Sequence, residues 1–175
     1  AGMFNNVSFK LDRGEILGVA GLIGAGRTEV MRAAFGADPY DSGECLMDGK
    51  PYKAKTPKDT IKKGLGLIPE DRRGQGLLLE KNVKENTSLA SLFANSNHGF
   101  INFGWEKQES VSYIEKLRIK TPSELALLKN LSGGNQQKVV IAKWLLAKSR
   151  ILIMDEPTRG IDVNAKSEIY ALMKE

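Results

Sequence analysis

The sequence predicts an α/β fold with a largely parallel sheet, and three observations support this. Apolar segments typical of strands alternate with segments of helical periodicity. A glycine-rich loop at 21–26 joins a predicted strand to a predicted helix. Four consecutive apolar residues, Ile151–Met154, are typical of a buried parallel strand. The length of 175 residues suits one domain, and 41% hydrophobic against 27% charged residues excludes a wholly disordered chain.

The N-terminal third is predicted to contain two strands, a helix and a hairpin. The strands are Met3–Lys10 and Glu15–Ala20, joined by a turn at 11–14. The helix runs over Thr28–Phe35 and ends at Gly36. Residues 44–53 resemble a hairpin with a type I′ turn, because Asp-Gly at 48–49 favours positive φ angles.

The remaining elements are mostly helices. A helix over Pro57–Lys63 precedes a short strand, Gly66–Ile68. Residues 83–93 and 105–117 have helical periodicity, with a polar loop at 94–104 between them, and indicate a helical insertion into the α/β core. Further helices are predicted from Ser132 to about Ala147 and over Asn164–Lys174.

The net charge and the cysteine content limit the partners and the cellular compartment that the sequence allows. The net charge is +5, and six lysines fall between Lys50 and Lys63; we interpret them as a solvated face, with nucleic acid or anionic lipid as the alternative partners. A single cysteine, Cys45, excludes an internal disulfide and suits a reducing compartment. No segment reads as a transmembrane helix or signal peptide. The only histidine, His98, is interpreted as a surface loop residue.

The glycine-rich loop has the pattern of a phosphate-binding loop. It matches G-x-x-x-x-G-K-[ST] except for arginine at the lysine position. Glycines let main-chain amides approach phosphates closely, and the following helix adds its positive end. Guanidinium keeps the charge of lysine but is broader and planar, so nucleotide binding can survive while hydrolysis suffers. The predicted nucleotide-binding residues are Gly21, Leu22, Ile23, Gly24, Ala25, Gly26, Arg27, Thr28 and Glu29.

Two carboxylates follow the apolar run 151–154. Asp155 and Glu156 lie at the C-terminal end of the predicted strand, the edge where open α/β sheets bind ligands. Because consecutive strand residues point to opposite faces, the two acids are expected to have separate roles. Asp155 suits the Mg²⁺ shell together with the Thr28 hydroxyl, and Glu156 suits polarising an attacking water as general base. The alternative is a pair of surface acids.

A second predicted anion site begins a later helix. Its residues are Leu131, Ser132, Gly133, Gly134, Asn135 and Gln136. Ser132 is a candidate N-cap, and two glycines expose consecutive amides at the helix start. A dimer that holds nucleotide between one subunit's phosphate loop and its partner's Ser-Gly-Gly helix would need both sites.

Together these motifs resemble the nucleotide-binding domain of ABC transporters. In that resemblance 21–28 is the Walker A loop, 131–137 the signature, 151–156 the Walker B strand with its acid, and Gly160, Ile161 and Asp162 belong to the D-loop. The resemblance implies a P-loop NTPase of ABC type, with a mixed sheet flanked by helices, a small antiparallel β part and an α-helical subdomain at 77–130. It implies ATP and Mg²⁺ as ligands.

Four strings resemble a narrower branch, the monosaccharide importers whose ATPase subunit contains two fused nucleotide-binding domains. They are GAGRTE at 24–29, IPEDRR at 68–73, LSGGNQQK at 131–138 and DEPTRGIDV at 155–163. In that branch the Walker A arginine is typical of the C-terminal domain. The resemblance implies that 1–175 is that domain, incomplete at both ends, because the family's adenine-stacking aromatic precedes residue 1 and its switch histidine follows residue 175.

Glu70 departs from the wider family, which usually has glutamine there. A carboxylate can still coordinate Mg²⁺, so the predicted metal ligands are Thr28, Asp155 and Glu70. Arg72 and Arg73 are interpreted as surface arginines, with contact to phosphate across an interface as the alternative. Trp105 and Trp144 are interpreted as packing residues.

The resemblance implies an ATPase that powers monosaccharide import. Its expected partners are a second nucleotide-binding domain, transmembrane permease subunits and, indirectly, a periplasmic sugar-binding protein, with no nucleic acid. It would lie peripherally at the cytoplasmic face of the inner or plasma membrane. Two alternatives stay open: a degenerate half that supplies its signature to a partner site, and a soluble ABC ATPase acting on nucleic acid.

Overall fold

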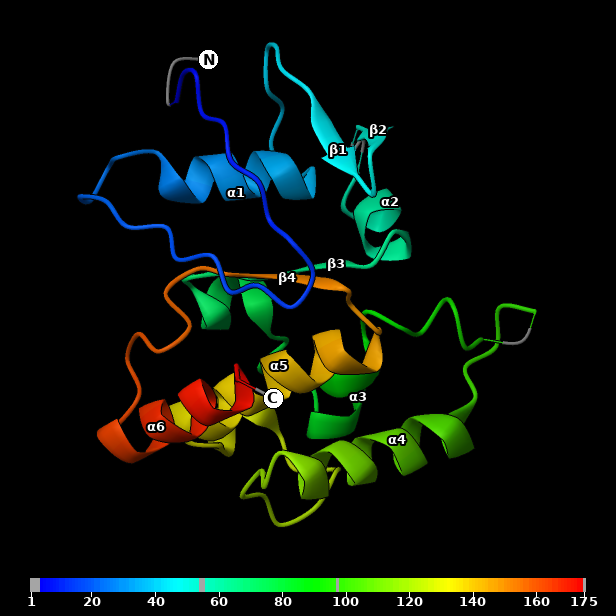
Figure 1. Ribbon diagram of the computed structural model, residues 1–175. Helices are drawn as coiled ribbons and strands as arrows, with labels where there is room; N and C mark the ends of the chain where they lie inside the picture. Colours follow the sequence, from blue (N-terminus) through cyan, green and yellow to red (C-terminus); the bar gives the residue numbers. More distant parts are fainter. Residues whose placement is uncertain (1–3, 54–55, 97, 175) are drawn as a thin grey trace. The chain divides into compact units, whose positions relative to one another are not determined.

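The computed structural model describes residues 4–53, 56–96 and 98–174, which form two compact units, 1–63 and 64–175 (Figure 1). In the described part of the chain no helix is both long and apolar enough to cross a bilayer.

The first unit contains α1 (Arg27–Phe35), the hairpin β1 (Cys45–Met47) and β2 (Lys50–Tyr52), and α2 (Pro57–Lys62). Gly36 ends α1 in the left-handed region, at φ 77, with its amide bonded to carbonyls in the last turn, as predicted. The hairpin is antiparallel, and positive φ at Asp48 and Gly49, 51° and 72°, confirms the type I′ turn. The Thr60 hydroxyl, fully buried, joins α2 to α1 by donating to Phe35 O at 2.6 Å.

The two predicted N-terminal strands are wrong for the residues that the structure describes. The turn at 11–14 is present, with Glu15 N–H bonded to Asp12 O at 3.2 Å. Residues 4–10 and 15–20, however, form no β-ladder among the described residues. Their alternating apolar side chains remain largely exposed, as at Phe9 (54%) and Ile16 (64%). Alternation gives an extended segment two distinct sides, but a strand also needs a partner to complete its ladder.

The second unit is built around a parallel strand pair and one long helix. Strand β3 (Leu65–Ile68) pairs in register with β4 (Ile151–Met154), which confirms the parallel prediction. All four residues of β3 are buried, whereas those of β4 are only half-buried, so the prediction of a buried strand at 151–154 is wrong as to its burial.

Helix α5 (Gly133–Leu146) supplies more buried apolar side chains to this unit than any other described element. It buries Val139, Val140, Ile141, Ala142 and Trp144, so Trp144 is a packing residue as predicted. It contacts α3 (Val83–Ser88), α4 (Phe103–Lys116) and α6 (Val163–Leu172), and Figure 1 shows α6 in red alongside α5 in yellow. Two short turns complete the unit: the π-helical η1 (Arg72–Gly76) and the 3₁₀ turn η2 (Leu128–Asn130).

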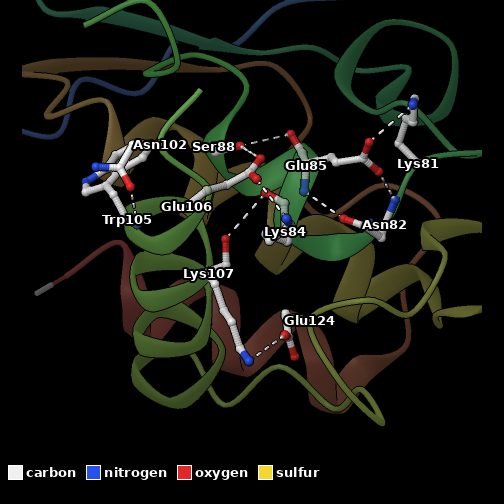
Figure 2. A network of polar contacts seen from close by, with 11 residues as sticks. Lys81, Asn82, Lys84, Glu85, Ser88, Asn102, Trp105, Glu106, Lys107 and Glu124 are labelled. Carbon is white, nitrogen blue, oxygen red and sulfur yellow. Dashed lines mark hydrogen bonds and ion pairs between the residues drawn. The ribbon is translucent and has the colours of Figure 1, made fainter. Parts of the chain in front are cut away.

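The helices α3 and α4 are joined by a polar network with a buried carboxylate at its centre (Figure 2). Glu106, 3% exposed, pairs with Lys84 at 2.8 Å and accepts a hydrogen bond from the Ser88 hydroxyl, also at 2.8 Å. A capping box formed by Asn82 and Glu85 begins α3. Asn102 caps α4 through the Trp105 amide at 3.0 Å. These bonds satisfy polar groups that the helix contact buries.

Helix α3 is shorter than the predicted 83–93, whereas α4 agrees with its prediction to within two residues. After Ser88 the backbone continues as turns through 94, and Ser91 donates its hydroxyl back to Ser88 O at 2.9 Å. Such local side-chain bonds compete with helix continuation. His98 lies in an exposed turn at φ 48, as predicted for a loop residue.

Candidate functional site

The glycine-rich loop leads directly into α1. Its glycines Gly24 and Gly26 have φ of 80° and 83°, a region that favours glycine. Gly26 is the N-cap of α1 and has no side-chain cap. The first main-chain bond of the helix runs from Val30 N–H to Gly26 O at 3.0 Å. The amides before Val30 therefore lie outside the helical ladder, at the positive end of the helix dipole.

The glycine-rich loop is exposed, so an anion could reach its main-chain amides. Leu22 is 84% and Ile23 fully exposed, so this stretch is not part of the described apolar core. A bond from Ala25 N–H to Leu22 O at 3.1 Å closes the loop into a turn. The loop therefore combines exposed backbone, left-handed glycines and a helix start, the combination that phosphate cradles use.

Arg27 begins α1 with its aliphatic stem folded against the loop. A β-carbon at Gly21 would lie 3.4 Å from Cδ of Arg27 and 3.4 Å from Cβ of Ala25. These are ordinary van der Waals distances, so the Arg27 stem lies close to Gly21 without excluding a β-carbon there. Thr28, the predicted hydroxyl ligand, is in the first turn of the same helix and half-buried.

The acidic residues of the second unit follow the paired ends of β3 and β4. Ile68 is in register with Met154, and Asp155 N–H continues the ladder by donating to Ile68 O at 2.9 Å. Glu70 follows β3 by two residues, so Glu70 and Asp155 lie at the same edge of the strand pair. Parallel strands direct their C-terminal ends to one edge, which is why residues far apart in sequence follow the same edge.

Glu156 is exposed, and its backbone lies in the left-handed region, at φ 45°. Its carbonyl accepts from Arg159 N–H at 3.0 Å, which closes a turn over 156–159. The chain therefore bends away immediately after Asp155, and the conformation of Glu156 depends on that turn. Non-glycine residues at positive φ are uncommon and occur often at functional sites.

The start of α5 contains the second predicted anion site. Ser132 occupies the N-cap position as predicted, but its side chain makes no cap bond to the helix; its hydroxyl instead accepts from Asn135 Nδ2 at 2.9 Å. Asn135 Oδ1 accepts from Lys120 N–H at 2.8 Å, and Gln136 Nε2 donates to the carbonyls of Leu128 and Leu131. Asn135 and Gln136 thus fix the loop before the helix.

Both signature glycines are sites of close approach. A β-carbon at Gly134 would lie 2.5 Å from Cβ of Ala165 in α6, too close for any side chain without movement of a helix. A β-carbon at Gly133 would lie 2.7 Å from Nη2 of Arg72 and 3.1 Å from Gly160 O. The two glycines therefore have a packing role, in addition to any exposure of their amides.

The segment 160–162, which is predicted as a D-loop, lies between the turn that follows Glu156 and helix α6. Gly160 has φ 67, and Asp162 caps α6 by accepting from Ala165 N–H at 2.9 Å. Ile161, between them, lies close to Gly133 as well. Lys138 of α5, 4% exposed, pairs with Glu168 of α6 at 2.7 Å, and this contact holds the pKa of Glu168 below its usual value. The loop thus enters a helix that is fastened to α5.

Arg72 is not a simple surface arginine. Its Nη1 donates to Arg159 O at 2.6 Å and its Nη2 to Gly160 O at 3.3 Å. Glu70 forms an ion pair with the Arg159 side chain. Sequence reasoning missed these contacts, because arginines that bond main-chain carbonyls have no distinctive spacing. The opposite charges at Glu70 and Arg159 were the one signal available.

Lys143 is a buried cation that sequence reasoning did not single out. It is 6% exposed, donates from Nζ to Gly76 O at 2.7 Å, and thereby joins α5 to η1. Burial lowers its pKa to about 8. The contact holds the end of η1 against the helix that begins with the signature.

The residues predicted to hold Mg²⁺ have suitable chemistry, since a hydroxyl and two carboxylates are the hard oxygen ligands that this ion prefers. Glu70 and Asp155 share an edge of the second unit, whereas Thr28 belongs to the first. Among the described residues no three His, Cys, Asp or Glu side chains gather as a metal site. The set of three ligands stays a prediction.

Comparison with known proteins identifies the family. The family model described as ABC transporter matches residues 4–159. The chain belongs to the ABC transporter family. The ABC fold is shared by an ATP-binding cassette, MJ0796, solved as a dimer in a post-hydrolysis state bound to ADP and Pi, with a TM-score of 0.80 at 21% identity over 96% of this chain and 72% of that one.

Relatives with higher identity cover nearly all of this ABC domain. A ribose import ATP-binding protein RbsA from Oceanobacillus iheyensis is 55% identical over 99% of the chain. A putative ribose/galactose/methyl galactoside import ATP-binding protein from Rhizobium etli is 52% identical, also over 99%. The chain spans 35% and 33% of the length of these two proteins.

Proposed function

We propose that this ABC domain binds and hydrolyses ATP to power import of a monosaccharide. The observation that carries the proposal is the identity of 55% over nearly the whole chain to a ribose import ATP-binding protein. The loop at the start of α1 supports it, because exposed backbone with glycines at positive φ before a helix suits a nucleotide's phosphates.

We assign the proposed roles to residues of both units. Gly21 to Glu29 bind the phosphates, with Arg27 as the cation. Thr28 and Asp155 hold Mg²⁺, and Glu70 is a further candidate ligand. When bound, Mg²⁺ neutralises charge on the phosphates. Glu156 accepts a proton from the attacking water. Leu131 to Gln136 and the loop at 160–162 face nucleotide held by a second domain.

The proposed partners are that second nucleotide-binding domain, the permease subunits and, indirectly, a periplasmic sugar-binding protein. Three exposed phenylalanines in the helical stretch 77–130, which we propose is a subdomain, support contact with the permease. Phe93 (81%), Phe100 (79%) and Phe103 (66%) are largely exposed there. A surface hollow in the same stretch is lined by Phe103, by the apolar residues Leu78, Leu89 and Ile101, and by charged residues that include Lys81 and Glu85. Such a contact would place the domain at the cytoplasmic face of the membrane.

Deletion of the gene tests the transport role. Cells without the full-length protein are expected to lose uptake of a labelled monosaccharide, with ribose, galactose and xylose tested separately. Purified transporter in vesicles should take up the same sugar only with Mg-ATP on the side of this domain. Unchanged uptake of all three sugars in the deletion strain would contradict the proposal.

A second candidate function is a domain that binds nucleotide with little hydrolysis, and Arg27 favours it. Its stem packs against Gly21, and a planar guanidinium cannot deliver charge as a slim ammonium does. On this view Arg27→Lys raises turnover at this site in the full-length protein by about tenfold or more. Single-turnover hydrolysis checks this, with Arg13→Lys, an exposed arginine before the loop, as control. Unchanged turnover would count against an impaired site.

A further inference from the structure

The guanidinium of Arg72 lies where three segments meet. It follows β3 by four residues, contacts the carbonyls of Arg159 and Gly160, and occupies the space beside Gly133. These segments are 26 to 88 residues apart in sequence, and each contains residues of the proposed site. All of them belong to the second unit.

The contacts of Arg72 constrain the turn after Glu156. Arg159 N–H bonds to Glu156 O, while Arg159 O accepts from Arg72 Nη1 at 2.6 Å. The side chain of Arg159 meanwhile pairs with Glu70. Arg159 is therefore held at its carbonyl and at its side chain by residues two positions apart. With Glu156 at φ 45, movement of this turn would redirect the Glu156 carboxylate.

These contacts differ in how much each is expected to stabilise the turn. The ion pair between Glu70 and Arg159 is substantially exposed, with side-chain exposures of 35% and 65%, and such pairs contribute little alone. The Arg72 bonds are charge-assisted, and its planar fork reaches two carbonyls at once. Burial lowers the pKa of Arg72, and its Nε is buried with no hydrogen-bond partner among the described residues. Nε is thus shielded from solvent, whereas the two bonds that the fork makes to carbonyls are exposed.

We propose that Arg72 is a positioning residue for ATP hydrolysis, which fixes the Glu156 turn and the first residue of the signature helix through one guanidinium. We call this set of contacts, from Arg72 to Arg159 O, Gly160 O and Gly133, the Arg72 bridge. It rests on the proposed ATPase function. It links the acid of the domain's own site to a signature that faces nucleotide on a second domain, so the two sites would be mechanically coupled.

The bridge also explains why residue 133 is glycine. A methyl group there would lie 2.7 Å from Nη2 of Arg72, and 3.1 Å from Gly160 O. Gly133→Ala is therefore expected to displace the guanidinium. The steric conflict should be relieved when Arg72 is also truncated.

Variants in the assembled full-length transporter test the bridge. Arg72→Ala is expected to lower kcat at this site by about ten- to a hundredfold, with Mg-ATP affinity and melting temperature unchanged. Arg72→Lys should give an intermediate kcat, because an ammonium cannot serve both carbonyls in the same way. Arg73→Ala, at the exposed neighbour, is the control and should match the wild type.

Amide hydrogen exchange reports the turn directly. Arg72→Ala should accelerate exchange over 158–161 without accelerating it over 139–146 of α5. Thermal unfolding should show that Gly133→Ala destabilises the protein and that Arg72→Ala/Gly133→Ala recovers part of the loss.

Glu156→Gln in the same assay separates the two proposals. If it abolishes hydrolysis while Arg72→Ala behaves as wild type, the bridge is wrong and the ATPase function stands. If neither variant changes hydrolysis at this site, the proposed function fails and the bridge with it. A fall in kcat that is matched by unfolding, and is equal for Arg72→Lys and Arg72→Ala, would reduce Arg72 to a structural residue and also overturn the proposal.

Discussion

Replacing Glu156 by glutamine in the full-length protein should lower hydrolysis at this site by about a hundredfold or more, with Mg-ATP affinity nearly unchanged. Glutamine has the size of glutamate but cannot take a proton from water. Glu156 is exposed and follows β4 by two residues, so the substitution removes no buried side chain. The expected loss is therefore in the chemical step and not in folding.

Single-turnover hydrolysis with radiolabelled ATP measures this loss, and equilibrium binding of ATP measures the affinity. Glu44→Gln, at an exposed glutamate in the first unit, is the matched control and should leave both unchanged. If Glu156→Gln hydrolysed ATP at the wild-type rate at this site, Glu156 would not be the general base. Lost binding as well as lost turnover would assign Glu156 a different role.

Removing the Glu106 carboxylate is expected to have the largest effect on stability. Glu106→Ala would leave the Lys84 ammonium, whose side chain is 15% exposed, without its partner at 2.8 Å. It would also remove the acceptor of the Ser88 hydroxyl (Figure 2). Breaking a buried pair costs about 3 to 5 kcal/mol, and partial exposure of Lys84 favours the lower end. Loosening of α3 against α4 should follow.

Denaturant unfolding of the full-length protein, combined with amide exchange over 83–88 and 103–116, measures this effect. Glu115→Gln, an exposed glutamate in the same helix, should behave as wild type. The double variant Lys84→Met/Glu106→Leu should regain most of the lost stability, because the cost arises from a lone buried charge. Faster exchange in the double variant than in Glu106→Ala would contradict this explanation.

Local sequence patterns predicted the elements whose geometry is determined locally. The Asp48-Gly49 turn has the positive φ angles that its residues favour, and Gly36 ends α1. The apolar runs at 66–68 and 151–154 predicted two strands of a largely parallel sheet, and β3 and β4 do pair in parallel. The family resemblance, based on four motifs in order, is confirmed by the match over 4–159.

Non-local contacts were beyond sequence reasoning. The alternation at 4–10 and 15–20 predicted strands, but ladder formation depends on a partner that the segment itself does not specify. The two main-chain carbonyls that Arg72 contacts belong to residues 87 and 88 positions away in the sequence. The burial of Glu106 and Lys143 depends on which helices pack together, and a charged residue gives no local sign of it. The roles of the predicted site residues stay predictions for the same reason.

The buried ammonium of Lys143 couples unfolding of the domain to the uptake of a proton. Its pKa is about 8 in the folded domain against an ordinary value of 10.5, so between these values the folded state is mostly neutral there and the unfolded state mostly protonated. Unfolding in that window takes up a proton, and raising the pH therefore disfavours it. Below pH 8 both states hold the proton, and the folded domain bears the full cost of a desolvated charge. The formal charge of +5 thus overstates the charge of the folded domain once the pH approaches 8.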